Sequence, residues 1–168
     1  MPPSTVTLIM RAHDDSSEPP LNASAAEPPA EVVELAERIA RTVRPNMVQS
    51  IRAFQPADLQ QVADYWGQHF LYANLEEATT KQRILEEIGR QFLLPGYFGR
   101  NLDALYDCLT DTLSGVGRQP GFIVVLEHIP ISVKFDKEMR EQLLDVFRDA
   151  ADFWAERNVP FRGFYSFF

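Results

Sequence analysis

FIVVLE, residues 122–127, is the clearest indication of the fold, because it is apolar almost throughout and has the length of a strand. Such a run is typical of a strand at the centre of a sheet. Two other short apolar runs, QHFLYA (68–73) and FRGFYSFF (161–168), predict strands before and after it. Amphipathic helical patterns separate the three runs, which indicates parallel strands joined by helical crossovers. The sequence therefore predicts an α/β fold with a three-stranded parallel sheet.

Three helices are expected between these strands, each with an apolar face directed at the core. Asn101 is a good N-cap for the second helix, and Asp136 can cap the third. The expected core positions are Ile84, Leu85, Ile88 and Phe92 in the first helix, Leu102, Leu105, Leu109 and Leu113 in the second, and Met139, Leu143, Phe147, Ala150 and Trp154 in the third.

The N-terminal part of the chain has a different character. Proline is frequent in residues 1–30, and residues 12–30 contain one large aliphatic residue, so residues 1–30 are expected to be a flexible segment and linker. Residues 31–67 predict two short helices and are interpreted as an accessory helical extension. Periodicity leaves open whether this extension packs on its own domain or on a partner. We expect residues 68–168 to form the functional domain and to fold on their own.

The formal net charge of −8 bears on the class of partner. Affinity for nucleic-acid backbones comes largely from Lys and Arg, so nucleic acid is not expected as a direct ligand. An acidic surface attracts and steers a basic partner instead. The apolar run near the N-terminus is too short for a secretory signal or a membrane span, so we expect a cytoplasmic protein without membrane contact. The single cysteine, Cys108, excludes an intrachain disulfide and agrees with a reducing compartment.

The stretch LPGYFGRNLDALYDCLTD, residues 94–111, carries side chains that could bind such a partner. At about 100° per residue, Asp103, Asp107 and Asp111 lie opposite the leucine face of the helix, with Tyr106 beside them. Like charges four residues apart repel, and aspartate is a poor residue inside a helix, so this face reduces stability. That pattern is typical of a binding surface, whereas an ordinary solvated helix face is the simpler interpretation.

The segment PGYFGRNLDALYDCLTD (95–111) closely resembles, without a gap over seventeen positions, the binding loop and helix of barstar-like proteins. These are bacterial intracellular inhibitors of secreted ribonucleases. Their motif reads approximately Pro-x-Tyr-aromatic-Gly-x-Asn-Leu-Asp-Ala-Leu-aromatic-Asp-Cys-Leu. A weaker resemblance extends over residues 68–168, in which VFRDA (146–150) is similar to the second contact segment of the family. The resemblance implies a barstar-like sheet with the strand order 1-2-3.

The resemblance also implies a function. Its loop and helix would block the active site of a cognate ribonuclease toxin, and the protein would act in the bacterial cytoplasm as an immunity protein or antitoxin, without catalysis or a cofactor. A carboxylate that pairs with active-site cations substitutes for a substrate phosphate. By motif position, the expected partner-binding residues are Tyr97, Phe98, Gly99, Asn101, Asp103, Tyr106, Asp107, Asp111 and Asp149.

Four positions depart from the family pattern. Arg100 stands where an acid is usual, Tyr106 replaces a tryptophan, Asp111 replaces a glycine, and Asp149 replaces the longer glutamate. These differences bear on the choice of target, because a cation at the loop edge could reject one nuclease and pair with an acidic rim on another. Three further acidic residues on the last helix are expected to form a solvated face: Asp145, Asp152 and Glu156.

Other functions fit the sequence less well. Two carboxylates four residues apart could serve a retaining glycosidase, but a catalytic acid needs a desolvated cleft and this face should be exposed. His13, His69 and His128 show no metal-ligand spacing, so no metal is expected. Cys108 has no histidine near it in sequence, which favours packing over nucleophilic catalysis. The main alternative is a nucleic-acid mimic that binds a different basic nucleic-acid-binding protein, which would need long rows of carboxylates at phosphate spacing.

Overall fold

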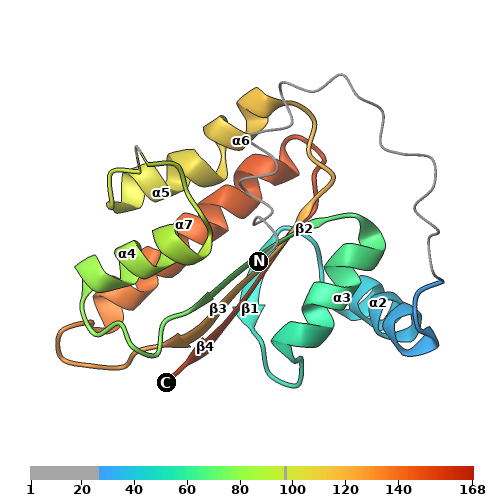
Figure 1. The fold of residues 1–168 in the computed structure, drawn as a ribbon, viewed down its shortest axis with the longest axis horizontal. Coiled ribbons are helices and arrows are strands. Elements are labelled where there is room, and N and C mark those ends of the chain that lie inside the picture. The colour runs from blue at the N-terminus through green and yellow to red at the C-terminus, as the bar shows by residue number, and fades with distance from the viewer. Residues whose placement is uncertain (1–26, 97) are drawn as a thin grey trace.

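Residues 27–96 and 98–168 are described by the computed structural model of the chain. Within them, a four-stranded parallel sheet carries helices on both faces (Figure 1). The strands are β1 (Met47–Ser50), β2 (His69–Asn74), β3 (Phe122–Ile129) and β4 (Phe161–Phe167). The helices are α2 (Ala30–Thr42), α3 (Pro56–Trp66), α4 (Lys81–Gln91), α5 (Leu102–Leu109), α6 (Asp111–Val116) and α7 (Lys137–Ala155). Residues 1–26, which hold most of the predicted flexible segment, lie outside the described residues.

The central position expected for FIVVLE is confirmed. The sheet order is β1-β4-β3-β2, so β3 pairs with β2 on one side and with β4 on the other, and every neighbouring pair is parallel. All side chains from Phe122 to Leu126 are buried, since helices cover both faces of the sheet. A strand covered on both faces has no polar side, which explains the continuous apolar run.

The prediction of three strands is wrong, because the predicted helical extension supplies a fourth. The three predicted strands do lie next to one another in the expected order, and β1 adds to the outer side of β4, with Met47 opposite Arg162. Asn46 holds the start of β1: its φ is +63°, and its Nδ2 donates to the carbonyls of Ala151 and Val159, both at 2.9 Å. Four residues are too few to show a strand period, and their partner strand lies at the other end of the chain.

Helices α2 and α3 cover one face of the sheet (Figure 1). The apolar face of α2 is buried, so this helix packs on its own sheet, which answers the question that periodicity left open. The buried residues of this layer are Val32, Ala36, Ile39, Val43, Leu59, Val62 and Ala63 from the helices, and Ile123, Val125 and Phe164 from the sheet. The region 31–67 is therefore one side of the hydrophobic core.

Helices α4, α5 and α7 cover the opposite face of the sheet, where the larger core cluster lies. Asp136 caps α7 as predicted, since its Oδ1 accepts a hydrogen bond of 3.0 Å from the amide of Met139. From that cap α7 runs along β4 and β1 and packs beside α5. This arrangement brings the solvent-facing sides of α5 and α7 next to each other.

Candidate functional site

The helix predicted from Leu102 to Leu113 is interrupted at Thr110, where the backbone leaves helical geometry with φ −127° and ψ −90°. Thr110 is fully buried, and its hydroxyl donates to the carbonyl of Tyr106 at 2.7 Å. The carbonyl of Leu109 accepts a hydrogen bond of 2.9 Å from the indole Nε1 of Trp154 in α7. Two side chains thus supply the partners that carbonyls at a helix end need.

This interruption corrects the prediction that Asp103, Asp107 and Asp111 share one helix face. Asp103 and Asp107 lie on α5, whereas Asp111 begins α6. Asp111 is exposed and does not line the groove that the other two aspartates border. Asp111 therefore lies outside the groove lining, and its contact with a partner stays a prediction.

We expect Trp154→Phe to lower the free energy of unfolding by about 1–3 kcal/mol, because it leaves a buried carbonyl without a donor. Urea unfolding measures the loss, and amide exchange should quicken in α5. Trp66→Phe is the matched control, since the Trp66 indole makes no hydrogen bond within the described ranges. Equal losses in the two variants would show that the bond to Leu109 does not matter.

The loop before α5 is held by the motif residues themselves. Asn101 caps the helix as predicted, with its Oδ1 accepting from the amide of Ala104 at 2.8 Å, and its Nδ2 donates to the carbonyl of Gly99 at 3.3 Å. The Phe98 ring is half-buried and lies against Gly89 of α4 so closely that a Cβ there would approach the ring to 2.8 Å. Phe98, Gly99 and Asn101 therefore shape the loop and do not line the groove. Tyr97, the predicted loop aromatic, lies outside the described residues.

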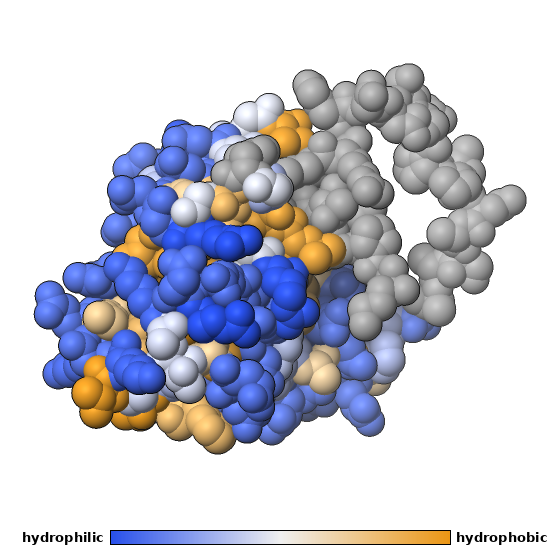
Figure 2. Space-filling model, turned by 60° about the vertical axis from the view of Figure 1, so that its left-hand side comes forward, coloured by the Kyte–Doolittle hydropathy of each residue, from blue (hydrophilic) through white to orange (hydrophobic). Residues whose placement is uncertain are grey.

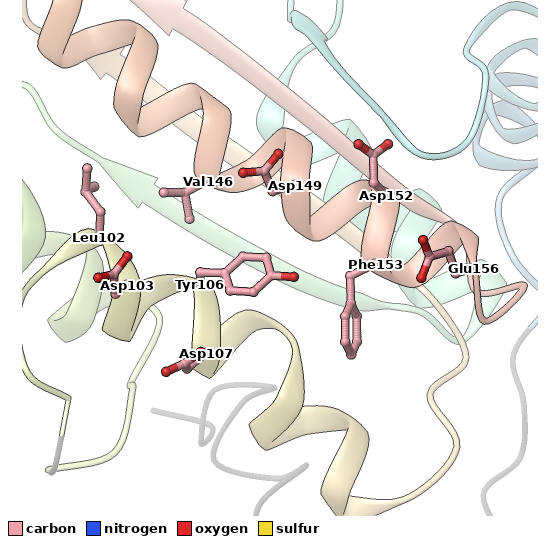
Figure 3. A pocket seen from close by; sticks show the side chains of 9 residues that line it. All are labelled: Leu102, Asp103, Tyr106, Asp107, Val146, Asp149, Asp152, Phe153 and Glu156. Atoms are coloured by element: carbon pink, nitrogen blue, oxygen red, sulfur yellow. The ribbon is translucent and has the colours of Figure 1, made fainter.

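A groove of about 510 Å³ runs between α5 and α7 (Figure 3). The Tyr106 ring extends from α5 across the groove toward Phe153 of α7. The complete lining is Leu102, Asp103, Tyr106, Asp107, Val146, Asp149, Asp152, Phe153 and Glu156. The groove thus brings together four of the predicted contact residues: Asp103, Tyr106, Asp107 and Asp149.

The charge of this groove is entirely negative. Its five carboxylates are solvent-exposed, and no Lys or Arg is among the lining residues. Within the part of the chain that the structure describes, only Glu156 has an ion-pair partner, Arg157, at the limiting distance of 4.0 Å. Figure 2 shows one face of the molecule, on which hydrophilic residues predominate and smaller hydrophobic patches lie among them. The groove is an acidic surface with two aromatic rings.

A scan against protein-family models finds a match over residues 68–166 to Barstar (barnase inhibitor). The match covers more than half of the chain and includes both helices of the groove. The chain belongs to the barstar family. No curated protein matches the sequence. The resemblance read from residues 95–111 is therefore confirmed, and members of the barstar family are inhibitors rather than enzymes.

Three groove residues were missed by the barstar motif and by the sequence interpretation: Asp152, Phe153 and Glu156. Two of them were predicted as a solvated face; they are exposed, but they border the groove. Their spacing from Asp149, by three, four and seven residues, places them on one stripe of α7 and was visible in the sequence. What the sequence could not show is that this stripe lies beside Tyr106.

Two arginines near the groove are paired with acidic residues outside its lining. Arg148 contacts Asp145 at 2.8 Å and Glu141 at 3.0 Å, so Asp145 belongs to a surface ion pair away from the groove lining. Arg100, the departure from the barstar pattern, lies 3.9 Å from Glu86 of α4 and is exposed. Its guanidinium is therefore directed at α4 and leaves the groove acidic.

Cys108 and His69 lie outside the groove lining, and neither has the surroundings of a catalytic group. Cys108 is buried, and burial together with the charge of Asp107 raises the pKa of its thiol, so the thiolate that nucleophilic catalysis needs is disfavoured. His69 contacts Gln119 at 3.0 Å, and burial lowers its pKa.

In residues 27–96 and 98–168, no cluster of three or more His, Cys, Asp or Glu could hold a metal ion. Across the same ranges, no helix has the length and apolar character to span a membrane. His13 lies outside them.

Proposed function

We propose that this protein inhibits a cognate bacterial ribonuclease toxin by covering its active site with the acidic groove between α5 and α7. The observation that carries the proposal is the convergence of five carboxylates and two aromatic rings in a chain that belongs to a family described as barnase inhibitors. In this proposal the protein acts in the bacterial cytoplasm as an immunity protein or antitoxin.

The chemistry of the target supports this assignment. A ribonuclease must hold cationic groups where it binds the phosphates of RNA, and carboxylates that replace those phosphates form charge-assisted hydrogen bonds with the same groups. Asp103 and Asp107 from α5 and Asp149 from α7 approach such a surface from two sides of the groove. Tyr106 and Phe153 supply the apolar contact area that the core of an interface needs.

The same geometry argues against the alternatives. The groove carboxylates are exposed, whereas a catalytic acid needs a desolvated site that raises its pKa. A duplex mimic would need carboxylates in long rows, but these five are concentrated in one groove between two short stretches of helix. Compact negative charge beside aromatic rings fits the active-site cleft of a single enzyme.

The direct test begins with the ribonuclease, obtained as the protein encoded beside this one or captured from the native cell by the full chain. Purified inhibitor should suppress cleavage of a fluorescent RNA substrate at a ratio of one to one. An excess of RNA oligonucleotide should slow complex formation, since both ligands use the same site. A complex in which RNA cleavage continues at the free-enzyme rate would overturn the proposal.

We expect the association rate constant to fall about tenfold or more between low and physiological salt, because ions screen the attraction of a basic enzyme to the groove. The dissociation rate should change much less, since paired charges inside an interface are poorly screened. Stopped-flow mixing or surface binding kinetics separates the two rates. An association rate that is independent of salt would show that the acidic groove does not guide binding.

A further inference from the structure

On the other face of the sheet, Arg162 of β4 is buried, with only 7% of its surface exposed. Its Nε donates to the carbonyl of Val43 at 3.3 Å, and its guanidinium carbon lies 5.0 Å from the centroid of the Trp66 ring. No carboxylate of the described residues lies within ion-pair distance of the Arg162 guanidinium. Among the same residues, neither Nη1 nor Nη2 of Arg162 donates a hydrogen bond. A buried charge is ordinarily paired, because an unpaired one is costly.

Arg162 lines a pocket of about 390 Å³. The pocket opens where α2 and α3 end and where β2 and β4 begin, and its other lining residues are Ala40, Pro45, Trp66, Gln68 and Pro160. All of these except Gln68 are apolar. The Oε1 of Gln68 is itself buried and accepts no hydrogen bond from the residues described. The pocket thus combines one cation and one polar amide with an aromatic and proline wall.

We propose that this pocket binds a small carboxylic acid with an apolar or aromatic body. The free edge of the Arg162 guanidinium matches the two oxygens of a carboxylate, and Trp66 with the two prolines contacts the body of the acid. A single guanidinium balances the single charge of a carboxylate, whereas a phosphate dianion would need further donors. Small-molecule sites commonly have this composition, a mainly apolar lining with a few polar groups that fix orientation.

Two further observations agree with this assignment. Burial lowers the pKa of Arg162, because desolvation acts on the guanidinium without a compensating anion. The side chain still stays protonated, since the ordinary pKa of arginine is very high. The pocket shares no lining residue with the groove between α5 and α7. The acid site is therefore independent of the surface proposed for ribonuclease inhibition.

The test uses the full chain labelled with ¹⁵N, with benzoate as the probe and benzamide as its neutral analogue of the same shape. Benzoate should shift the Nε–H resonance of Arg162 saturably, with a dissociation constant on the order of 1 mM, as expected for a ligand of this size. Benzamide and inorganic phosphate should bind at least about tenfold more weakly. Equal binding of benzoate and benzamide, tighter binding of phosphate, or no benzoate binding would each overturn the proposal.

Variants locate the binding. Arg162→Gln should weaken benzoate binding about tenfold or more, measured by calorimetry after circular dichroism confirms folding. If that variant does not fold, Trp66→Leu keeps the guanidinium and should weaken benzoate more than it weakens acetate. Arg38→Gln is the matched control, because Arg38 also lies over a ring, 5.7 Å from the centroid of Phe54, but is exposed. Loss of benzoate binding in the Arg38 variant to the same degree would contradict a specific site.

Discussion

The double variant Asp103→Asn, Asp107→Asn should inhibit the target ribonuclease about 100-fold or more weakly than the unaltered protein. Each substitution keeps the shape of the side chain and removes one charge, and a hydrogen bond to a charged group contributes about 1.5–3 kcal/mol. Two such losses together correspond to a change of about two decades or more in affinity. Titration of RNA cleavage at physiological salt measures the effect.

The control for this variant is Asp64→Asn, which makes the same chemical change on an exposed position of α3, away from the groove lining. It lowers the net negative charge without touching the groove, so its inhibition should be almost unchanged. The free energies of unfolding of all variants should stay within about 0.5 kcal/mol of one another, as is usual for exposed positions. If the Asp64 variant loses as much inhibition as the double variant, overall charge and not the groove determines binding.

Removal of residues 1–67 should prevent stable folding, contrary to the prediction from sequence that residues 68–168 suffice. The deletion removes β1, α2 and α3, and with them the cover of Ile123, Val125 and Phe164. Those side chains would then face water across one whole side of the sheet, and β4 would become an exposed edge that invites aggregation. Circular dichroism and size-exclusion chromatography of the fragment test this. A monomeric fragment with a cooperative thermal transition would contradict it.

A single substitution in the same layer gives a graded version of the experiment. Leu59 of α3 is completely buried, so Leu59→Ala should lower the free energy of unfolding by about 2–5 kcal/mol. Leu93→Ala removes the same atoms from a side chain that is 44% exposed and should cost about 0.5 kcal/mol or less. Similar losses at the two positions would show that α3 is not part of the core.

The acidic groove could be predicted in part because half of it is local in sequence. Asp103 and Asp107 lie within two turns of the helix that Asn101 caps, where side-chain direction follows from residue spacing. The contribution of Asp152 and Phe153 depends instead on how α7 packs beside α5, which is fixed by buried contacts far apart in the chain. The same limitation hid the interruption at Thr110, since the donor that accompanies it comes from Trp154.

Local patterns in the sequence predicted the α/β class, the central strand, the caps at Asn101 and Asp136 and the family motif, because these depend on short-range periodicity and on local hydrogen bonds. Three features became apparent only from the folded chain: Met47–Ser50 is a strand, α2 and α3 complete the core, and Tyr106 and Phe153 border one groove. Each of these depends on pairing or packing between segments distant in the chain, and the periodicity within one segment does not show which other segment it contacts.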